Sequence, residues 1–320
     1  MAHLAEFLQK IGAEVVVYTN GESTVNVEKR WLFKETQWPL KNDDLPELKD
    51  VEHTCWALLD ANEECDIVHL NTGSALACSR FAKVPLVYTL HHPTNKHLTK
   101  LYSRFPQVDY VCISDDQRGR EIMPRTTTIH HGIDLSQYRL QEKKQPYLSF
   151  IGRIAPIKGT HLAVEIAQKS GIPLKIAGEV QPEFREYFEA KVKPHIDGRF
   201  IEFVGLADLK LKNELLGNSM AMLFPIQWDE PFGLVMVEAM ACGTPVLALK
   251  HGSVPEIVRN GVSGYCARRV NDLVKHARDL RFSSAAVREY AEAHFSAERM
   301  AQNYLTLYHS ILDRQRKEVA

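Results

Sequence analysis

Residues 229–246 read Asp-Glu-Pro-Phe-Gly-Leu-Val-Met-Val-Glu-Ala-Met-Ala-Cys-Gly-Thr-Pro-Val. The small and apolar side chains from Gly233 to Cys242 predict a helix, because Gly243 is placed to end it and Pro245 cannot continue it. The run that follows, residues 246–249, is Val-Leu-Ala-Leu and predicts a buried strand. A buried helix that leads directly into a buried strand is typical of an α/β protein.

Two carboxylates bracket the start of this predicted helix. Glu230 lies just before it, and Glu238 lies roughly 7–8 Å along its axis from Gly233, at ~1.5 Å per residue. The free amides of a helix N-terminus suit an anion, and acidic side chains beside them suit the hydroxyls of a sugar. The alternative is a core helix with an acid near its N-terminus that interacts favourably with the helix dipole.

The rest of the chain alternates predicted strands and helices. We expect strands at residues 13–19, 66–70, 85–90, 108–113 and 126–129, and a second series at residues 174–177, 200–204, 220–224 and 246–249 that starts from Tyr147. Helices are expected at residues 4–11, 45–61 and 74–82, and residues 285–317 have helical periodicity. This alternation predicts parallel sheets covered by helices on both faces. The polar run from Ser136 to Gln145 is the predicted linker between two domains.

The composition excludes several classes of protein. The chain has 320 residues, 45% of them hydrophobic, which is enough for a large core divided between two domains. Its formal net charge of -1 provides no overall field to attract nucleic acid or membranes. The six cysteines include no C-x-x-C pair, which predicts reduced thiols and no zinc site. Because no apolar run approaches the ~18–20 residues of a membrane span and no signal peptide is evident, we expect a cytoplasmic protein.

The spacing of Glu230 and Glu238, with seven residues between them, resembles the signature of the retaining glycosyltransferases of family four, which include sucrose synthases and bacterial mannosyl- and glucosyltransferases. The residues around both glutamates match the same signature. Residues 152–159 resemble the family's Gly-Arg…Lys-Gly element, and residues 252–258 and 260–265 match its downstream segment. The resemblance covers nearly the whole chain and is strongest over residues 146–267.

The resemblance implies the GT-B architecture, in which two doubly wound Rossmann-like domains face a cleft. We expect an acceptor-side domain at residues 1–140, a donor-binding domain at residues 141–296, and a last helix at residues 297–320 that crosses back to the N-terminal domain. Family members begin with a strand and a glycine-rich loop, whereas this sequence starts inside the helix that follows them. The N-terminal domain is therefore expected to lack its first strand, to be loosely ordered and to support little transfer.

Arg153 and Lys158 follow the first strand of the second domain, in a loop framed by Gly152 and Gly159. Arginine offers a planar fork for phosphate oxygens and lysine a movable point charge, while glycines allow the backbone to approach a ligand closely. The alternative is a solvated basic loop. The resemblance implies that both cations neutralise the diphosphate of a nucleotide sugar.

The resemblance also assigns roles to the motif itself. It implies that Glu238 binds the ribose hydroxyls and that Glu230 binds hydroxyls of the transferred sugar and takes part in catalysis. The backbone amides at the helix start would bind the diphosphate or the sugar; these belong to Gly233, Leu234 and Val235.

Several histidines lie at the ends of predicted strands. His91 matches the family's histidine at the cleft edge of its strand, so the resemblance implies a catalytic position close to the donor sugar. His69 could line the same sheet edge, although packing explains it as well, and no chemistry is assigned to His92, His130 or His131. No set of His, Asp or Cys has metal-ligand spacing, so we expect neither a metal nor another cofactor.

The implied reaction is transfer of a hexose from a nucleotide diphosphate sugar to an acceptor hydroxyl, with retained anomeric configuration and without a metal. UDP-glucose is favoured as donor over GDP-mannose, and the acceptor and the oligomeric state are not indicated. A rival interpretation is a catalytically weak nucleotide-sugar-binding protein with a regulatory or scaffold role. A third is another two-domain enzyme, such as an epimerase or a phosphorylase.

Overall fold

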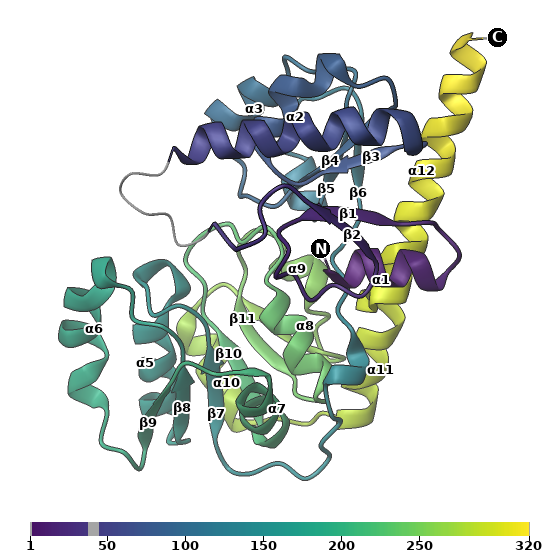
Figure 1. The fold of residues 1–320 in the computed structure, drawn as a ribbon. Coiled ribbons are helices and arrows are strands. Elements are labelled where there is room, and N and C mark those ends of the chain that lie inside the picture. Colours follow the sequence, from purple (N-terminus) through teal and green to yellow (C-terminus); the bar gives the residue numbers. More distant parts are fainter. Residues whose placement is uncertain (1, 38–44, 320) are drawn as a thin grey trace. The chain divides into compact units, whose positions relative to one another are not determined.

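The computed structural model describes residues 2–37 and 45–319, and its chain divides into two compact units (Figure 1). The first unit contains Met1–Gly132 together with Ala297–Ala320, and the second contains Ile133–Ser296. Each unit has parallel sheets flanked by helices, so the predicted α/β class is confirmed.

The second unit is built on one six-stranded parallel sheet in the order β12-β11-β10-β7-β8-β9. Its strands are β7 (Leu148–Ile151), β8 (Leu174–Ala177), β9 (Ile201–Gly205), β10 (Ala221–Phe224), β11 (Val246–Leu249) and β12 (Gly264–Ala267). Every residue of β7, β10 and β11 is buried, because helices cover both faces of a doubly wound sheet. The strand order reverses between β7 and β10, the place where such sheets bind ligands.

Helices connect these strands and supply the rest of the core. They are α5 (Thr160–Ser170), α6 (Arg185–Lys191), α7 (Leu209–Asn218), α8 (Leu234–Ala241), α9 (Val254–Ile257), α10 (Val270–Arg278) and α11 (Ser284–Phe295), with short 3-10 turns η3 (Pro156–Lys158), η4 (Pro182–Phe184) and η5 (Lys193–His195). The predicted helix before Gly243 is α8, and Gly243 has the left-handed φ of +73° that ends it.

The segment predicted as a linker is held firmly within the second unit. The Gln141 amide donates to the Cys242 carbonyl at 3.2 Å, and Arg288 donates to the Tyr138 carbonyl at 2.9 Å. Lys144 donates to the Gly217 carbonyl and to the Thr244 hydroxyl, each at 2.8 Å, and burial lowers its pKa to about 8. A lysine in this position satisfies acceptors where α7 and α8 end.

The strands of the first unit form two parallel sheets. One pairs β1 (Val16–Thr19) with β2 (Glu28–Trp31), and the other has the order β3-β4-β5-β6. The latter contains β3 (Val68–Leu70), β4 (Leu86–Leu90), β5 (Asp109–Cys112) and β6 (Thr126–Thr128). The helices are α1 (Ala2–Lys10), α2 (Pro46–Glu64), α3 (Lys96–Tyr102), α4 (Asp115–Arg118) and α12 (Ala297–Val319), with 3-10 segments η1 (Gly73–Phe81) and η2 (Leu135–Gln137), the last in the second unit.

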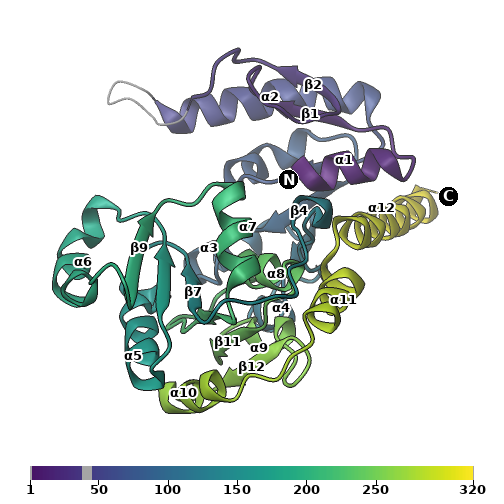
Figure 2. The ribbon, with the colours of Figure 1, turned by 90° about the horizontal axis from the view of Figure 1, so that it is seen from below.

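The final helix packs into the first unit although it lies at the other end of the sequence. Figures 1 and 2 show α12 beside α1, and a shared cluster of buried side chains joins Phe7, Val87, Val111 and Tyr304. His69 on β3 connects the sheet to this helix, because its Nδ1 lies 2.7 Å from the Tyr308 hydroxyl. Its Nε2 lies 2.7 Å from the Thr89 hydroxyl, which lies 2.8 Å from the Tyr304 hydroxyl.

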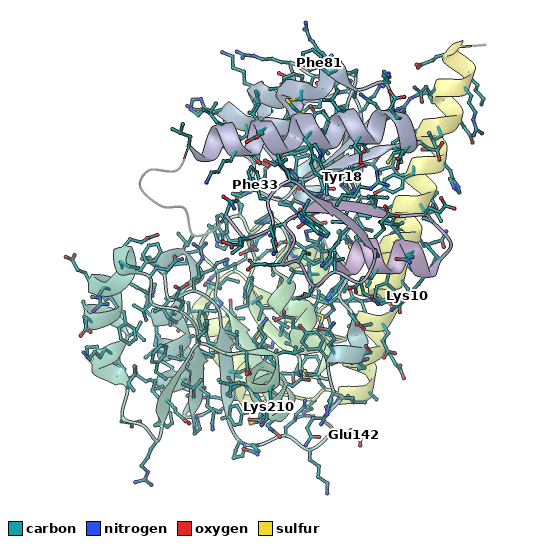
Figure 3. All side chains as sticks on the ribbon, viewed as in Figure 1. Lys10, Tyr18, Phe33, Phe81, Glu142 and Lys210 are labelled. Carbon is teal, nitrogen blue, oxygen red and sulfur yellow. The ribbon has the colours of Figure 1, made fainter. Side chains whose placement is uncertain are left out.

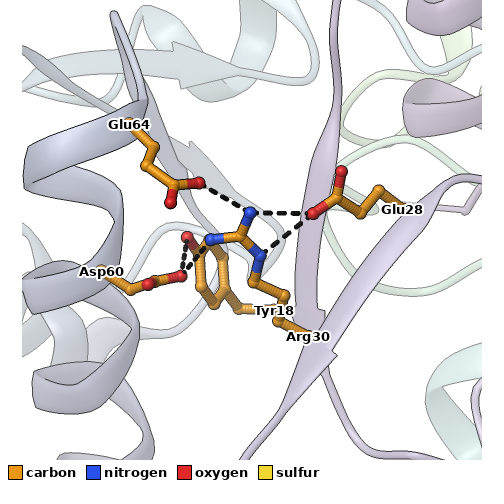
Figure 4. Close-up of polar contacts among 5 residues, drawn as sticks. All are labelled: Tyr18, Glu28, Arg30, Asp60 and Glu64. Carbon is orange, nitrogen blue, oxygen red and sulfur yellow. Dashed lines mark hydrogen bonds and ion pairs between the residues drawn. The ribbon is translucent and has the colours of Figure 1, made fainter.

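An ionic cluster joins the two-stranded sheet to α2 (Figure 4). Arg30 on β2 donates to Asp60 and Glu64 of α2, each at 2.6 Å, and Tyr18 donates to Asp60 at 2.8 Å. Hydrogen bonds from Arg30 and then Tyr18 lower the pKa of Asp60. Figure 3 shows Tyr18 within this unit and Phe81 at its surface, where Phe81 is 72% exposed.

Some local elements differ from the sequence predictions. Residues 74–82 were expected to be α-helical, yet the segment is the 3-10 helix η1. Neither β2 nor β12 was predicted; β2 has the polar sequence Glu-Lys-Arg-Trp, and β12 starts at a glycine. The expected strand at residues 13–19 is shorter and begins at Val16.

Candidate functional site

The loops after β7 and β10 meet beside the point where the strand order of the second unit reverses. The Gln227 amide of the β10 loop donates to the Ile157 carbonyl of the β7 loop at 2.8 Å. Gly159 ends the β7 loop with a φ of +71°, and a Cβ there would lie 1.9 Å from the Pro225 carbonyl oxygen. Only glycine permits this approach, which brings the side chains of the two loops together.

Lys158 and Glu230 form an ion pair across these loops. The Lys158 ammonium donates to Glu230 Oε2 at 2.5 Å, with side chains only 15% and 10% exposed. The indole N–H of Trp228 donates to the same oxygen at 3.1 Å, and the ammonium lies 4.9 Å from the centroid of the Trp228 ring. A poorly hydrated lysine beside an aromatic face and a carboxylate is a strong candidate for binding an anionic ligand.

A neighbouring turn fixes the backbone around Glu230. The Ser253 amide donates to the Glu230 carbonyl at 2.9 Å, and the Ser253 hydroxyl donates to the Phe232 carbonyl at 3.0 Å. Gly252 packs so closely that a Cβ would lie 2.5 Å from the Glu230 carbonyl oxygen. These contacts place the downstream Gly-Ser element directly against the backbone of Glu230.

The start of α8 follows Glu230 directly. Gly233 is its N-cap with a φ of +82°, and Leu234 is 43% exposed, whereas the helix is buried from Met236 onward. The first amides of an α-helix have no acceptor within the helix, and its dipole favours negative charge there. The amides of Gly233, Leu234 and Val235 therefore belong to an exposed helix end.

Glu238 lies in a second group of side chains, further along α8. It is 8% exposed and accepts from the Tyr138 hydroxyl at 3.0 Å, while the Lys212 ammonium on α7 lies 2.8 Å from its Oε1 and 3.0 Å from its Oε2. Burial, and after it the charge of Glu238, raises the pKa of Tyr138. A carboxylate offers about four acceptor positions, so these donors leave capacity for a ligand hydroxyl.

Arg153 is exposed and lies apart from the Lys158–Glu230 pair in the hydrogen-bond network. Its guanidinium donates to the Gln181 amide oxygen at 3.4 Å, a long contact. Of the predicted site residues in this unit, Lys158 and Glu230 contact each other directly, and the start of α8 follows Glu230 in the chain. Glu238 and Arg153 have other contact partners.

His91 belongs to the first unit, where it directly follows β4. Its Nε2 lies 3.0 Å from the Asn71 side-chain oxygen, and because that oxygen only accepts, Nε2 carries the proton. The ring stacks on His131 with centroids 5.5 Å apart, and burial lowers the pKa of His91 to about 4. His91 is therefore neutral at pH 7, with Nδ1 as an acceptor.

Three residues of these groups were not found from the sequence: Trp228, Tyr138 and Lys212. Trp228 lies two residues before Glu230, so its position beside the motif was a signal that could have identified it. Tyr138 and Lys212 reach Glu238 from distant segments, and nothing in their local sequence indicates this. Within residues 2–37 and 45–319, no group of three His, Cys, Asp or Glu side chains is placed to hold a metal ion.

Comparison with known families covers both units. The model "Glycosyltransferase Family 4" matches residues 1–137, and "Glycosyl transferases group 1" matches residues 134–281. The chain therefore belongs to the family-four-like glycosyltransferases.

Individual characterised relatives share about a quarter to a third of their residues with this chain over the aligned segments. Spore coat protein SA of Bacillus subtilis is 26% identical over 62% of this chain and 63% of its own length. Glycogen synthase of Mycobacterium tuberculosis is 28% identical over 74% of this chain and 63% of its own length. N-acetyl-alpha-D-glucosaminyl L-malate synthase of Bacillus anthracis is 32% identical over 41% of this chain and 36% of its own. The chain spans less than two thirds of the length of each.

Solved structures share the fold. Sucrose-phosphate synthase from Thermosynechococcus elongatus has a TM-score of 0.77 at 18% identity and covers 97% of this chain and 92% of its own. Anabaena Alr3699/HepE in complex with UDP has a TM-score of 0.73 at 18% identity, with 97% and 96% covered. AviGT4, a glycosyltransferase involved in Avilamycin A biosynthesis, has a TM-score of 0.74 at 23% identity, with 97% and 88% covered. Within the described part of the chain, no helix is long and apolar enough to cross a bilayer.

Proposed function

We propose that this protein transfers a hexose from a nucleotide diphosphate sugar to an acceptor hydroxyl, with retained anomeric configuration and without a metal. UDP-glucose is the favoured donor and GDP-mannose the alternative. One observation carries the proposal: the buried Lys158–Glu230 pair lies on the two loops beside the strand-order reversal of the second unit. The Anabaena neighbour of the same fold was solved with UDP, which supports the uridine donor.

Each charged group has a proposed part in donor binding. Lys158 and Arg153 neutralise the diphosphate, and the amides of Gly233, Leu234 and Val235 bind its oxygens at the start of α8. Glu238 binds the ribose hydroxyls and Glu230 the hydroxyls of the transferred sugar. The role of His91 toward that sugar rests on the resemblance of its strand end, and its neutral ring suits contact with a hydroxyl.

The chemistry follows from charge development in the transition state. As the bond between the sugar and the diphosphate breaks, negative charge grows on the leaving phosphate, where Lys158, Arg153 and the helix start stabilise it. A phosphate oxygen of the leaving group accepts the proton of the incoming hydroxyl, so that the new bond forms on the face the diphosphate leaves. Glycosidases instead need two carboxylates that flank the bond; the carboxylates of Glu230 and Glu238 are held in separate contacts.

A thermal-shift panel followed by product analysis tests this function. UDP, GDP, ADP and their sugar derivatives are added to the chain, and a ligand at one hundred times its Kd should add about 2.7 kcal/mol to the stability. The best sugar nucleotide is then assayed for transfer or hydrolysis, with the anomeric configuration read by NMR. Binding without turnover would favour the nucleotide-sugar-binding interpretation, and no stabilisation by any nucleotide would refute the donor site.

A further inference from the structure

Trp228 donates a hydrogen bond to Glu230, the carboxylate that also pairs with Lys158. Among the described residues, the side-chain donors to Glu230, which are Lys158 at 2.5 Å and Trp228 at 3.1 Å, both end on Oε2. Oε1 of this carboxylate is thereby left to accept from a hydroxyl. The half-buried indole is attached two residues away, so it moves with the loop that carries Glu230.

The two hydrogen-bond donors, the Lys158 ammonium and the Trp228 indole, respond differently to a bound diphosphate. An ammonium on a flexible stem is attracted by the phosphate charge and can leave Glu230 for it. The indole N–H is uncharged and fixed to a rigid ring, so it stays on Oε2. When the donor binds, Trp228 becomes the group that keeps the Glu230 carboxylate oriented.

We propose that Trp228 is a positioning residue that holds Glu230 Oε2, so that Oε1 accepts a hydroxyl of the transferred sugar. This inference rests on the proposed function. It extends that function by assigning recognition of the sugar, as distinct from the nucleotide, to a Trp–Glu pair. The indole ring also has a second role. In the free protein the Lys158 ammonium lies 4.9 Å from the ring centroid, and this cation–π contact holds it until the diphosphate binds.

The test separates nucleotide binding from sugar binding with calorimetry of UDP and UDP-glucose, or GDP and GDP-mannose if the panel selects guanine. Trp228→Phe keeps an aromatic face for Lys158 and removes the N–H. We expect unchanged UDP affinity and an approximately tenfold loss for UDP-glucose, the effect of a hydrogen bond to a charged group. Trp56→Phe, the same change in the first unit, should alter neither affinity.

A double-mutant cycle completes the experiment. In a Glu230→Ala background, Trp228→Phe should cause little further loss of UDP-glucose affinity, because the acceptor of the indole N–H is already gone. Equal effects of Trp228→Phe on UDP and UDP-glucose, or none on either, would overturn the positioning role while leaving the proposed function intact. A wild-type chain that binds no nucleotide would overturn the proposed function and this inference with it.

A separate observation concerns two cysteines of the first unit. Cys55 on α2 and Cys78 on η1 have their sulfur atoms 3.6 Å apart. Cys78 is 5% exposed and packs in a core cluster, while Cys55 is half-buried against the same cluster. A disulfide has its sulfurs about 2.05 Å apart, so these two thiols must approach by about 1.5 Å for the bond to form.

We infer that this pair is a site of reversible oxidation by hydroperoxides. The thiolate of Cys55, the less buried of the two, attacks hydrogen peroxide; the O–O bond breaks, Cys55 becomes a sulfenic acid and one water is released. Burial raises the pKa of the Cys78 thiol to about 11, so Cys78 is the thiol that reacts second. The second thiol then attacks that sulfur, an S–S bond forms, and a second water leaves. Two thiols lose two electrons and two protons in total, and hydrogen peroxide is reduced to two waters.

Mass spectrometry of the full chain tests the site after treatment with hydrogen peroxide and alkylation of the remaining thiols. We expect a linked Cys55–Cys78 peptide that dithiothreitol separates, and its loss in Cys55→Ser and in Cys78→Ser. Cys65→Ser, which changes a half-buried cysteine at the end of the same helix, should keep the link. Both thiols still alkylated after peroxide, or oxidised singly to sulfinic acid, would overturn the inference.

Discussion

Lys158 has two anionic partners in the proposed reaction, Glu230 in the free protein and the diphosphate in the complex. Lys158→Ala should weaken UDP binding about ten- to hundredfold, because a hydrogen bond between charged groups is lost. Arg153→Ala should weaken it as well. Glu230→Gln should leave UDP affinity near normal, because Glu230 is assigned to the sugar and not to the nucleotide, yet it should lower turnover because its sugar contacts matter most in the transition state.

Calorimetry with UDP checks these variants, and Lys191→Ala provides the control because Lys191 is an exposed lysine elsewhere on the same unit. If Lys158→Ala and Arg153→Ala bind UDP as the wild type does, the donor site is elsewhere. A large loss of UDP affinity in Glu230→Gln would instead assign Glu230 to the nucleotide.

Glu238 is distinguished from the diphosphate-binding groups by its expected ligand, the ribose. Glu238→Ala should weaken UDP several-fold and leave the affinity for inorganic pyrophosphate unchanged, whereas Lys158→Ala should weaken both. The variant also leaves Tyr138 and Lys212 without their shared partner, so a loss of stability is expected. Competition titrations with pyrophosphate make the comparison, and equal losses for the two ligands would argue against a ribose contact.

These residues also show what the sequence reveals about a site. Glu230 and Lys158 were identified because each lies in a dense local motif beside a strand end. Tyr138 and Lys212 were not, because they reach Glu238 across 100 and 26 positions of the chain, and only the fold creates that neighbourhood. Trp228 is intermediate, because it lies directly beside the motif but its indole has a partner only once the loop is folded.

At the scale of one element, the start of α8 depends on Gly233. Gly233→Ala should destabilise the protein and weaken UDP binding, because a Cβ would meet Met236 Cε at 2.8 Å and Phe224 Cζ at 3.2 Å, in a backbone with φ of +82°. Gly261→Ala is a matched control, since its φ is +76° and no atom lies within 4 Å of its Cβ. We expect about 1 kcal/mol of backbone strain in the control and more in Gly233→Ala.

Chemical denaturation and calorimetry with UDP measure both variants. Both variants have the cost of a left-handed backbone, so the difference between their free energies of unfolding measures the steric crowding at the start of the helix. Equal UDP affinity in Gly233→Ala and Gly261→Ala would show that the α8 start does not contact the nucleotide.

The His69 contacts that join β3 to α12 make the first unit sensitive to acid. Burial lowers the pKa of His69 to about 3, against about 6.5 in the unfolded chain. The unfolded chain therefore binds more protons between these values, and the free energy of unfolding falls as pH drops from about 6.5 toward 3, by at most about 1.4 kcal/mol per pH unit.

His69→Gln should flatten that part of the stability profile, measured by urea unfolding at a series of pH values. His309→Gln changes an exposed histidine on α12, the helix that His69 contacts, and should leave the profile as in the wild type. An unchanged slope in His69→Gln would assign the acid sensitivity to other buried groups, of which His131, with a pKa lowered to about 3, is the next to test.

The elements of the second unit were the easiest to predict. Residues 174–177 and 246–249 are strands with the predicted bounds. The second is a short continuous apolar run that is wholly buried, and the first departs from that pattern only at the partly buried Lys175. In contrast, three of the four residues of β2 are charged, and one of them, Arg30, pairs with acidic side chains on α2, so the sequence of β2 resembles a loop. The η1 segment has helical periodicity, and nothing in its sequence distinguishes a 3-10 helix from an α-helix.

On the scale of the whole chain, the α/β class and the family followed from alternation and motifs, and both are confirmed. The last helix raises a further expectation, because α12 is distant in sequence yet completes the core of the first unit. Tyr304 is 1% exposed and packs with Val87 and Val111 of the sheet. Tyr304→Ala should cost about 3–5 kcal/mol through the cavity it leaves, and Tyr304→Phe about 1 kcal/mol through loss of the contact with the Thr89 hydroxyl.

Hydrogen exchange shows which strands are destabilised by Tyr304→Ala. Because α12 belongs to the first unit, exchange in Tyr304→Ala should accelerate in β4 and β5 and stay unchanged in β7 and β10, which have their own core. UDP should then protect the β7 and β10 loops of the same variant as it does in the wild type. Accelerated exchange in β7 and β10 would mean that the two units unfold as one cooperative structure, and the donor site would then depend on a helix that the proposed mechanism does not use.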